Sequence, residues 1–431
     1  MAKSSQQIDL SGARDLPAVK HKTVISGAIG NVLEWYDFGV YAFFATTIAS
    51  QFFPSDSRTE SLIAVFGVFA AGYLMRPLGA ILFGHIGDRY GRKATLTISI
   101  VMMAVPTVAL GLLPNVAQIG SAAALLLVAC RLLQGISIGG EYTGSVVYLV
   151  EHAGTGGRGL LGTFAILGAG VGATLGSATA ALIDASLTAT QLAEWGWRIP
   201  FIAGGLSIGI AGFYLRRHMP DPPPMERAFH SPVIAAFRTQ WRNILRIVGL
   251  NMMHAVGVFM VFIYIKTYLH EHVGIPLAVA LTINTIAMFA LMGFTATFGA
   301  LSDRIGRKPV LIASSLAIMI SAYPLFIAFN VPNPAVILAA QLAFAVMIGA
   351  QAGTAPTTMA ELLPRTVRVS GTSIGYSICL SLFGGTTPLM AIYLIKIGGN
   401  DLVPAYYLMV AAAVTLAVVL SIKESANRAL D

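Results

Sequence analysis

Charged side chains are scarce in this sequence. Asp, Glu, Lys and Arg together make up 11% of the 431 residues, whereas hydrophobic residues make up 56%. A typical soluble domain carries about 25% charged residues. The composition therefore predicts an integral membrane protein.

Cysteine is nearly absent, and common catalytic motifs are missing. Cys130 and Cys379 lie in separate apolar runs, so the sequence predicts neither a disulfide framework nor a Cys-x-x-Cys metal site. A phosphate-binding Walker loop and a His-Glu-x-x-His zinc motif do not occur. We therefore expect no enzyme activity, no cofactor and no metal site.

Acidic residues are too few to balance the basic ones, and the formal net charge is +8. The basic residues stand at the ends of apolar runs, which is typical of membrane topology rather than of nucleic-acid binding. The stretch before the first apolar run is polar and carries Lys3, Arg14, Lys20 and Lys22, unlike a cleavable signal. We expect it to be a cytoplasmic tail, and we expect no nucleic-acid partner.

Long apolar runs fill most of the remaining sequence. Each has about 20 residues or more, enough for a helix that crosses a bilayer. The predicted spans are 24–50, 61–84, 95–113, 120–149, 161–184, 198–216, 247–268, 276–301, 310–329, 335–360, 370–394 and 404–422. This pattern predicts an all-α membrane protein whose twelve transmembrane helices form two six-helix bundles.

The loops between the spans suggest domain limits and an orientation. The predicted parts are a cytoplasmic N-terminal tail (1–22), a first bundle (23–216), a cytoplasmic linker (217–246), a second bundle (247–422) and a cytoplasmic C-terminal tail (423–431). With both termini in the cytoplasm, cytoplasmic segments hold 21 of the 27 Lys and Arg residues, as the positive-inside rule requires. The exceptions are Arg76 and Arg131 within spans and Arg58, Arg198, Lys266 and Lys396 in predicted outer loops.

Two motifs occur twice in the chain. The segment from Gly84 to Lys93 has the form G-x-x-x-D-R-x-G-R-K, and the segment from Gly299 to Lys308 repeats it 215 residues later. Glu151 and Arg158 recur as Glu361 and Arg368, both 210 residues later. The two motifs agree on one register, so the halves are predicted to be homologous.

The duplicated loop motif resembles the signature of the major facilitator superfamily. Further segments resemble its metabolite:proton symporter family, whose members carry proline and betaine, citrate, 2-oxoglutarate or shikimate. These segments are 31–38 (NVLEWYDF), 73–79, 131–135, 139–142 and 194–201. Within that family, GGEYTG at 139–144 and the segments 404–409 and 423–428 look most like the proline/betaine branch.

The resemblance implies a proton-coupled symporter that imports a small polar metabolite by alternating access between the two bundles. It also implies a monomer in the bacterial inner membrane, in contact with lipids. The near balance of acids and arginines within the spans favours a zwitterion such as proline or glycine betaine. A di- or tricarboxylate symporter, sodium coupling and a receptor that binds solute without transport are the alternatives.

Five charged residues fall inside predicted spans, where a charge is costly unless it is paired or hydrated. They are Glu34, Asp37, Arg76, Arg131 and Glu141. Asn31, Glu34 and Asp37 recur at i+3 spacing, which places them along one side of a helix. We expect that side to face a central cavity.

The acids Asp37, Glu34 and Glu141 are the candidates for proton coupling, with Asp37 preferred because it lies deepest. A neighbouring arginine stabilises the charged form of an acid, so a substrate carboxylate that captures the arginine lets the acid take a proton. Permanent ion pairs that only fix helix packing are the alternative, and Glu141 could equally serve in gating.

Binding of a substrate carboxylate is assigned first to Arg131, whose planar guanidinium suits a carboxylate, and further contacts are assigned to polar groups of both halves. The candidates are Arg131, Arg76, Tyr36, Tyr142, His254, Tyr264, Gln351 and Tyr376. Trp35, Tyr36 and Phe38 could form an aromatic cage for a quaternary ammonium. Core packing is the alternative for each of these residues.

The repeated motifs are predicted to hold a cytoplasmic gate closed through charge pairs that break on opening. The predicted gating residues are Asp88, Arg89, Arg92, Asp303, Arg304, Arg307, Glu151, Arg158, Glu361 and Arg368. Glu151 with Arg158, and Glu361 with Arg368, are expected to form matching braces. Solvated charges are the alternative.

Overall fold

The structure is a computed structural model that describes residues 21–90, 92–139, 141–153, 156–217, 232–364, 367–426 and 430. Residues 1–20 of the predicted N-terminal tail and 218–231 of the predicted linker lie outside this part of the chain. All regular secondary structure in the described residues is helical, without strands. This agrees with the predicted all-α class.

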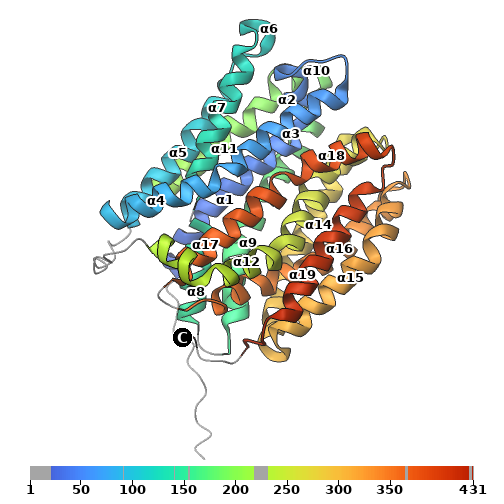
Figure 1. Ribbon diagram of the computed structural model, residues 1–431. Helices are drawn as coiled ribbons and strands as arrows, with labels where there is room; N and C mark the ends of the chain where they lie inside the picture. The colour runs from blue at the N-terminus through green and yellow to red at the C-terminus, as the bar shows by residue number, and fades with distance from the viewer. Residues whose placement is uncertain are drawn as a thin grey trace, which may run out of the picture.

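The first half contains eleven α-helices and one short 3-10 helix. They are α1 (His21–Phe43), α2 (Ala45–Phe52), α3 (Arg58–Leu74), α4 (Arg76–Tyr90), α5 (Arg92–Leu112), α6 (Val116–Ile119), α7 (Ala122–Ser137), α8 (Glu141–His152), α9 (Arg158–Ser186), α10 (Ala189–Glu194), η1 (Gly196–Arg198) and α11 (Ile199–Arg217). In Figure 1 these helices run from blue to green.

The second half contains eight α-helices and two π-helical segments. They are α12 (Pro232–Val258), η2 (Phe259–Tyr264), α13 (Ile265–Glu271), α14 (Leu277–Ile305), α15 (Arg307–Phe329), α16 (Pro334–Glu361), α17 (Arg368–Cys379), η3 (Leu380–Gly384), α18 (Thr387–Gly398) and α19 (Val403–Ser421). Residues 232–246 of the predicted linker are therefore helical, with a kink at Gln240 in α12.

Nine helical segments of the described chain are long and apolar enough to cross a membrane. A shorter apolar segment covers Thr97–Leu112 in α5. Several spans join two helices, for example Arg58–Phe83, which runs from α3 into α4, and Arg368–Gly398, which runs from α17 into α18. The chain thus forms a bundle that crosses a membrane many times.

Glycines let the helices of the first half approach at backbone distance. A Cβ atom added to Gly135 of α7 would lie 1.9 Å from the carbonyl oxygen of Gly72 in α3. On α9, a Cβ added to Gly172 would lie 2.3 Å from the Val32 carbonyl oxygen of α1. The second crossing holds α1 against α9, so the acidic side of α1 has a defined direction.

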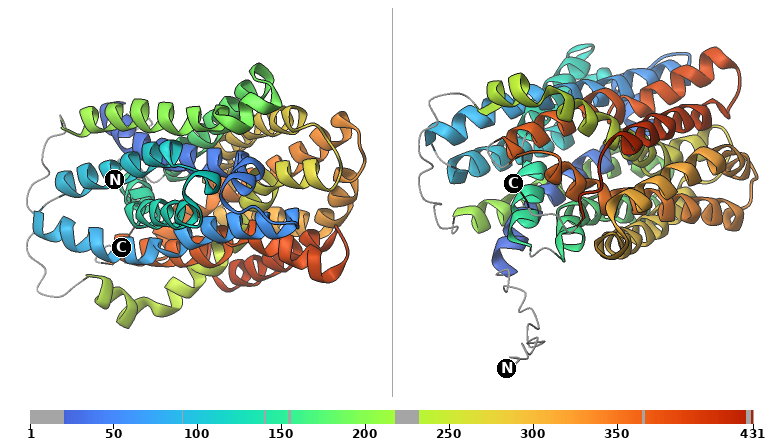
Figure 2. Two further views of the ribbon diagram at one scale, coloured as in Figure 1. Left: turned by 90° about the horizontal axis from the view of Figure 1, so that it is seen from above. Right: turned by 60° about the horizontal axis from the view of Figure 1, so that its bottom comes forward.

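The two halves lie side by side, as Figures 1 and 2 show. The contact between the halves involves α9 with α14 and α16, α4 and α8 with α17, and α3 with α18. We call the end of the bundle that carries the repeated loop motif (Asp303 to Arg307) the motif end, and the opposite end, which carries Arg58 and Glu271, the distal end.

Candidate functional site

A first buried ion pair joins α1 to α7 within the first half. Arg131 Nη1 donates to Asp37 Oδ2 at 2.7 Å, and both side chains are 0% exposed. Gln134 Nε2 donates to Asp37 Oδ1 at 2.9 Å and to the Thr107 hydroxyl of α5 at 2.8 Å. Each carboxylate oxygen therefore has a partner, as a buried charge requires.

Aromatic rings enclose the guanidinium of Arg131. Its Cζ atom lies 3.9 Å from the ring centroid of Tyr41 and 5.3 Å from that of Phe38, both within cation–π range. Nε and Nη2 of Arg131 have no hydrogen-bond partner among the described residues. These spare donors fit a carboxylate ligand, but the named neighbours all belong to the first half, so substrate binding by Arg131 stays a prediction.

A second buried ion pair joins α1 to the start of α4. Arg76 Nη1 donates to Glu34 Oε1 at 2.6 Å, and the two side chains are 3% and 5% exposed. The Arg76 Cζ atom lies 5.4 Å from the ring centroid of Tyr73. The hydroxyl of Tyr73 and Nε of Arg76 are buried without a hydrogen-bond partner in the described part of the chain.

The second pair lies at the contact between the halves. Tyr376 of α17, in the second half, lies within electrostatic range of both Arg76 and Glu34. Its ring stacks on that of Tyr142 from α8, with centroids 4.6 Å apart. The Glu34–Arg76 pair is therefore surrounded by side chains of both halves, unlike the Asp37–Arg131 pair.

The i+3 spacing of Asn31, Glu34 and Asp37 accounts for the two pairs, because it turns both acids toward helices of the same bundle. All three side chains are buried, and both amide atoms of Asn31 are without a hydrogen-bond partner among the described residues. The predicted meeting of span acids with span arginines is therefore present for two acids. The side chain of Glu141, the third candidate, lies outside the described residues.

A small, partly open cavity of about 50 Å³ lies between the halves. Its walls come from α1, α9, α12, η2, α14 and α16, and include Trp35, His254, Phe262 and Met292. The lining is mostly apolar, and His254 Nδ1 has no hydrogen-bond partner within the described chain. In this conformation the cavity is smaller than the roughly 300–1,000 Å³ of a ligand pocket, and His254 is its one described lining residue with an unsatisfied polar atom.

The proposed aromatic cage does not assemble. Trp35 lines the cavity, whereas Tyr36 donates its hydroxyl to the Pro200 carbonyl oxygen at 3.0 Å. Phe38 packs on Phe69, with centroids 5.6 Å apart. Neighbouring residues of a helix point about 100° apart, so Tyr36 points away from Trp35, while Phe38 packs within the first half. The three rings do not enclose one space. The cage interpretation is therefore wrong, although Trp35 alone reaches the cavity.

Two further candidates have packing roles in this conformation. Gln351 Nε2 donates to the Leu250 carbonyl oxygen at 2.7 Å within the second half, and its side chain is fully buried. Tyr264 packs edge-on against Phe66 of the first half at 5.9 Å. Neither lines the cavity between the halves, so their predicted contact with substrate would need a different conformation.

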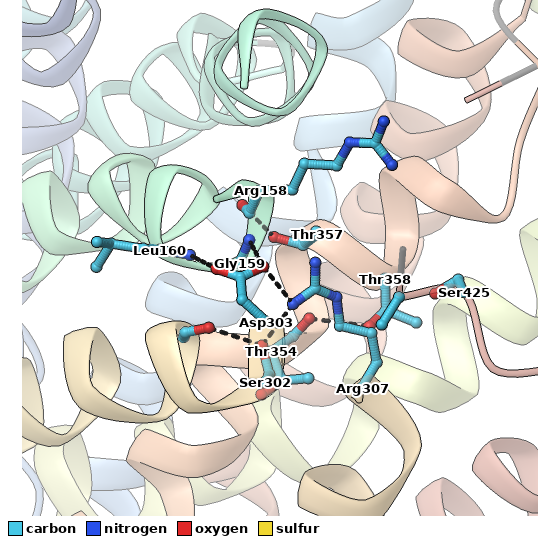
Figure 3. A network of polar contacts seen from close by, with 12 residues as sticks. Arg158, Gly159, Leu160, Ser302, Asp303, Arg307, Thr354, Thr357, Thr358 and Ser425 are labelled. Carbon is cyan, nitrogen blue, oxygen red and sulfur yellow. Dashed lines mark hydrogen bonds and ion pairs between the residues drawn. The ribbon is translucent and has the colours of Figure 1, made fainter. Parts of the chain in front are cut away.

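At the motif end, Asp303 joins the halves (Figure 3). Its Oδ1 accepts the Gly159 backbone N–H at 2.8 Å, and its Oδ2 accepts that of Leu160 at 3.0 Å. Both donors belong to the first turn of α9, where free N–H groups and the helix dipole favour a carboxylate. Arg307 Nη1 lies 2.9 Å from Asp303 Oδ1 and fixes the carboxylate from its own side.

One charged brace crosses between the halves, and the other lies within the second half. Arg368 Nη1 donates to Glu151 Oε1 at 2.7 Å, and Arg307 Nη2 lies 3.4 Å from Glu361 Oε1. The backbone carbonyl of Arg158 accepts the Thr357 hydroxyl at 3.0 Å. The expected pairing of Glu151 with Arg158 and of Glu361 with Arg368 is thus replaced by an exchange of partners, which spacing along one chain could not reveal.

The remaining predicted gating residues add no described contact. Arg304 is exposed. The side chains of Asp88, Arg89 and Arg92 lie outside the described residues.

Comparison with known proteins identifies the fold and the family. A family model described as Major Facilitator Superfamily matches residues 27–374 and again 247–429. The chain belongs to the Major Facilitator Superfamily. The second match begins at the start of the second half, as expected for a duplicated chain.

Relatives of this superfamily member are named transporters. A "Proline/betaine transporter" of Salmonella typhimurium is 34% identical over 430 residues, which cover 95% of this chain and 84% of that protein. An "Ectoine/proline transporter ProP" of Corynebacterium glutamicum is 33% identical and covers 99% of this chain and 89% of its own length. The predicted resemblance to the proline/betaine branch is therefore confirmed.

Among solved structures, the proton:xylose symporter XylE bound to 6-bromo-6-deoxy-D-glucose superposes with a TM-score of 0.76. It is 18% identical, and the match covers 95% of this chain and 97% of XylE. This likeness supports the fold alone. The superfamily member is a multi-pass integral membrane protein and not an enzyme, as the sequence predicted, and its bacterial relatives agree with the bacterial inner membrane.

Two ion pairs at the distal end also join the halves of this superfamily member. Arg58 and Glu271 approach to 2.5 Å, and Lys396 Nζ lies 3.5 Å from Glu60 Oε1. Neither pair was predicted from the sequence, because each partner stands in a different half. The halves are therefore joined at both ends in this conformation.

The C-terminal residues bind the gate of the second half, a contact that sequence reasoning missed. Glu424 accepts the backbone N–H groups of Arg307 and Lys308, both at 2.9 Å. Burial raises the pKa of the Glu424 carboxyl, but hydrogen bonds from four backbone N–H groups outweigh it and lower the pKa overall. Ser425 donates to Glu361 Oε2 at 2.6 Å. The sequence signal for this contact is Glu424, an acidic residue just after the last predicted span.

Proposed function

We propose that this protein is a proton-coupled symporter that imports a small carboxylate-bearing metabolite by alternating access. The observation that carries the proposal is the pair of buried acid–arginine contacts on α1, of which only Glu34–Arg76 includes a tyrosine of the other half. The names of the relatives support proline or glycine betaine as the solute. Protons are the proposed second partner.

The proposed topology has twelve spans. Adding α1, α5 and α11 to the nine apolar segments gives twelve. An even number of crossings places both termini on one side, and the positive-inside rule assigns that side to the cytoplasm. The motif end then faces the cytoplasm, the distal end faces outward, and the bundles cover 23–216 and 247–422.

In the proposed cycle, Arg76 receives the substrate carboxylate. A carboxylate at Arg76 competes with Glu34 for the same guanidinium, and Tyr142 and Tyr376 close over the site from two helices. The released Glu34 then becomes able to take a proton, because a negative charge stays in the membrane interior only when it is compensated. The same competition at Arg131 would free Asp37, which otherwise keeps Arg131 and Gln134 as partners. Substrate binding and proton binding are coupled by this competition.

The two sets of contacts between the halves supply the proposed gates. Asp303 with α9 and Glu151 with Arg368 close the motif end, whereas Arg58 with Glu271 closes the distal end. Alternating access requires that one set breaks while the other holds.

Uptake by the purified protein in proteoliposomes tests the function. With an inward proton gradient, we expect accumulation of proline or glycine betaine that a protonophore abolishes. Citrate, 2-oxoglutarate and shikimate are tested in parallel, and accumulation of one of them instead would transfer the assignment to the organic-acid alternative. Replacement of sodium by choline excludes sodium coupling if uptake is unchanged. Binding without any uptake would support the receptor interpretation and end the symporter proposal.

Loss of the Asp303 charge is expected to weaken closure of the motif end. In Asp303→Asn, the carboxylate no longer makes charge-assisted contacts with Arg307 and with the first turn of α9. This loss costs the closed state about 1.5–3 kcal/mol. The ratio of molecules with an open motif end to those with a closed one then rises about tenfold or more. We expect a clearly slower uptake with equilibrium binding of the solute nearly unchanged.

The matched control is Glu194→Gln, the same loss of one carboxylate at an exposed position of α10. Uptake is measured by rapid filtration and binding by scintillation proximity. An uptake rate of Asp303→Asn equal to that of the wild type would remove Asp303 from the gate.

A further inference from the structure

Lys266 is a buried amine that the proposed mechanism does not use. The sequence analysis placed it in an outer loop, but it is the second residue of α13 and only 1% exposed. Its Nζ donates to the backbone carbonyl oxygens of Phe262 at 3.2 Å and Ile263 at 2.5 Å. Among the described residues, none of the salt bridges gives it a carboxylate partner.

The π-helical turn η2 explains why these two carbonyls are available. A π-turn bonds residues five apart, so the ordinary i→i+4 partners are displaced, and the Lys266 ammonium fills the gap. Two carbonyl groups leave one of its three N–H donors unused. Such contacts are local to one helix, and an incoming anion can replace them without unfolding the turn.

The position of Lys266 is at the boundary between the halves. Phe43 of α1 covers the amine, with its ring centroid 3.6 Å from Nζ. Phe262 and Ile263, whose carbonyl oxygens accept from the amine, also line the cavity between the halves. Lys266 therefore stands beside the cavity and is separated from it by a single helical turn.

Depth along the helices places Lys266 nearer the distal end than Arg76. Lys266 precedes Glu271 of the distal ion pair by five residues, about 8 Å along a helix. Arg76 follows Arg58 of the same pair by 18 residues, about 27 Å along a helix. When the Arg58–Glu271 contact opens, α1 moves away from α13 and uncovers Lys266 first.

We propose that Lys266 binds the carboxylate group of the solute as it enters from the distal side, before the carboxylate reaches Arg76. A buried ammonium without a counter-ion favours the arrival of an anion. Phe43, whose ring covers the amine, belongs to the first half and moves away with it when the distal end opens. This inference rests on the proposed function. It adds a second carboxylate-binding position to the transport path.

The test compares Lys266→Gln and Lys266→Arg in proteoliposomes, with glycine betaine and proline as probes. Loss of one charge-assisted hydrogen bond predicts a half-saturating concentration about tenfold higher in Lys266→Gln, whereas Lys266→Arg stays close to the wild type. The matched control Lys423→Gln removes a lysine from an exposed site beyond α19. An unchanged half-saturating concentration in Lys266→Gln, with or without a lower melting temperature, overturns the proposal.

A second measurement does not depend on transport. Lys266→Cys is placed in a Cys130→Ser, Cys379→Ser background and treated from the distal side with an anionic, membrane-impermeant thiosulfonate. We expect labelling, and faster labelling when Arg58→Ala removes the distal ion pair. If neither probe is accumulated by the wild type but labelling follows this pattern, the proposed solute is wrong and the entry site stands. An unreactive cysteine in both backgrounds rejects the entry site.

Discussion

Asp37→Asn is expected to exchange solute across the membrane and to lose the ability to concentrate it. The amide mimics the protonated acid permanently, and exchange of one solute for another needs no net release of a proton. A proton that moves across 100 mV supplies about 2.3 kcal/mol, which is about fiftyfold in concentration. In the variant, the solute concentrations inside and outside the proteoliposomes should become equal.

Two assays in the same proteoliposomes measure this outcome, counterflow for exchange and gradient-driven uptake for accumulation. Glu34→Gln and Glu141→Gln are measured beside Asp37→Asn, because each of them removes another acid that could bind the coupling proton. If Asp37→Asn still accumulates solute in response to a pH gradient, the coupling proton binds to another acid. The variant that loses only accumulation identifies that acid.

Arg131→Ala is expected to destabilise the whole first half. The arginine is 0% exposed and supplies the positive charge beside Asp37. Removal of one partner of a buried ion pair typically costs about 3–5 kcal/mol, since the other charge is left uncompensated. We expect a large fall in the thermal unfolding temperature of the purified protein.

The double variant Arg131→Ala, Asp37→Ala serves as the control for this effect. If the loss comes from the unpaired carboxylate, removing the carboxylate as well should recover much of the stability, although the cavity left by both side chains keeps a cost. Equal instability of the single and double variants would show that packing of Arg131 on Tyr41, and not charge, stabilises this contact.

The fold class and the pairing of acids with arginines could be predicted from the sequence, because both depend on the local pattern of residues. Apolar runs predict transmembrane spans, and a charged side chain within such a run is usually stabilised by a nearby opposite charge. Glu34 and Asp37 stand at i+3 on one helix, so the sequence placed them on one side without knowledge of the neighbours. The helical part of the predicted linker was missed, because Arg238, Arg242 and Arg246 interrupt the apolar pattern there.

Contacts that cross between the halves could not be predicted from the sequence. Glu151 meets Arg368 and not Arg158, and Arg58 meets Glu271, because the register of one bundle on the other is set by packing of whole helices. Lys266 was assigned to a loop by its charge, although a π-turn lets the helix bury it. Helical geometry alone separates Tyr36 from Trp35 and Phe38, which stand at i+3 on one side of the helix. The separate surroundings of Trp35 and Phe38 depend on the neighbouring helices, which the sequence does not show.

The glycine crossings within the first half determine which parts of the molecule can move. Gly135 meets the Gly72 backbone, and a Cβ added to Gly139 or Gly79 would lie 2.0 Å from backbone atoms of Ala80 or Ile136. Helices in contact at this distance cannot easily slide past one another, so α3, α4 and α7 have to move as one rigid unit. A single methyl group added at Gly135 would force α3 and α7 apart and break up this unit without touching any charged residue.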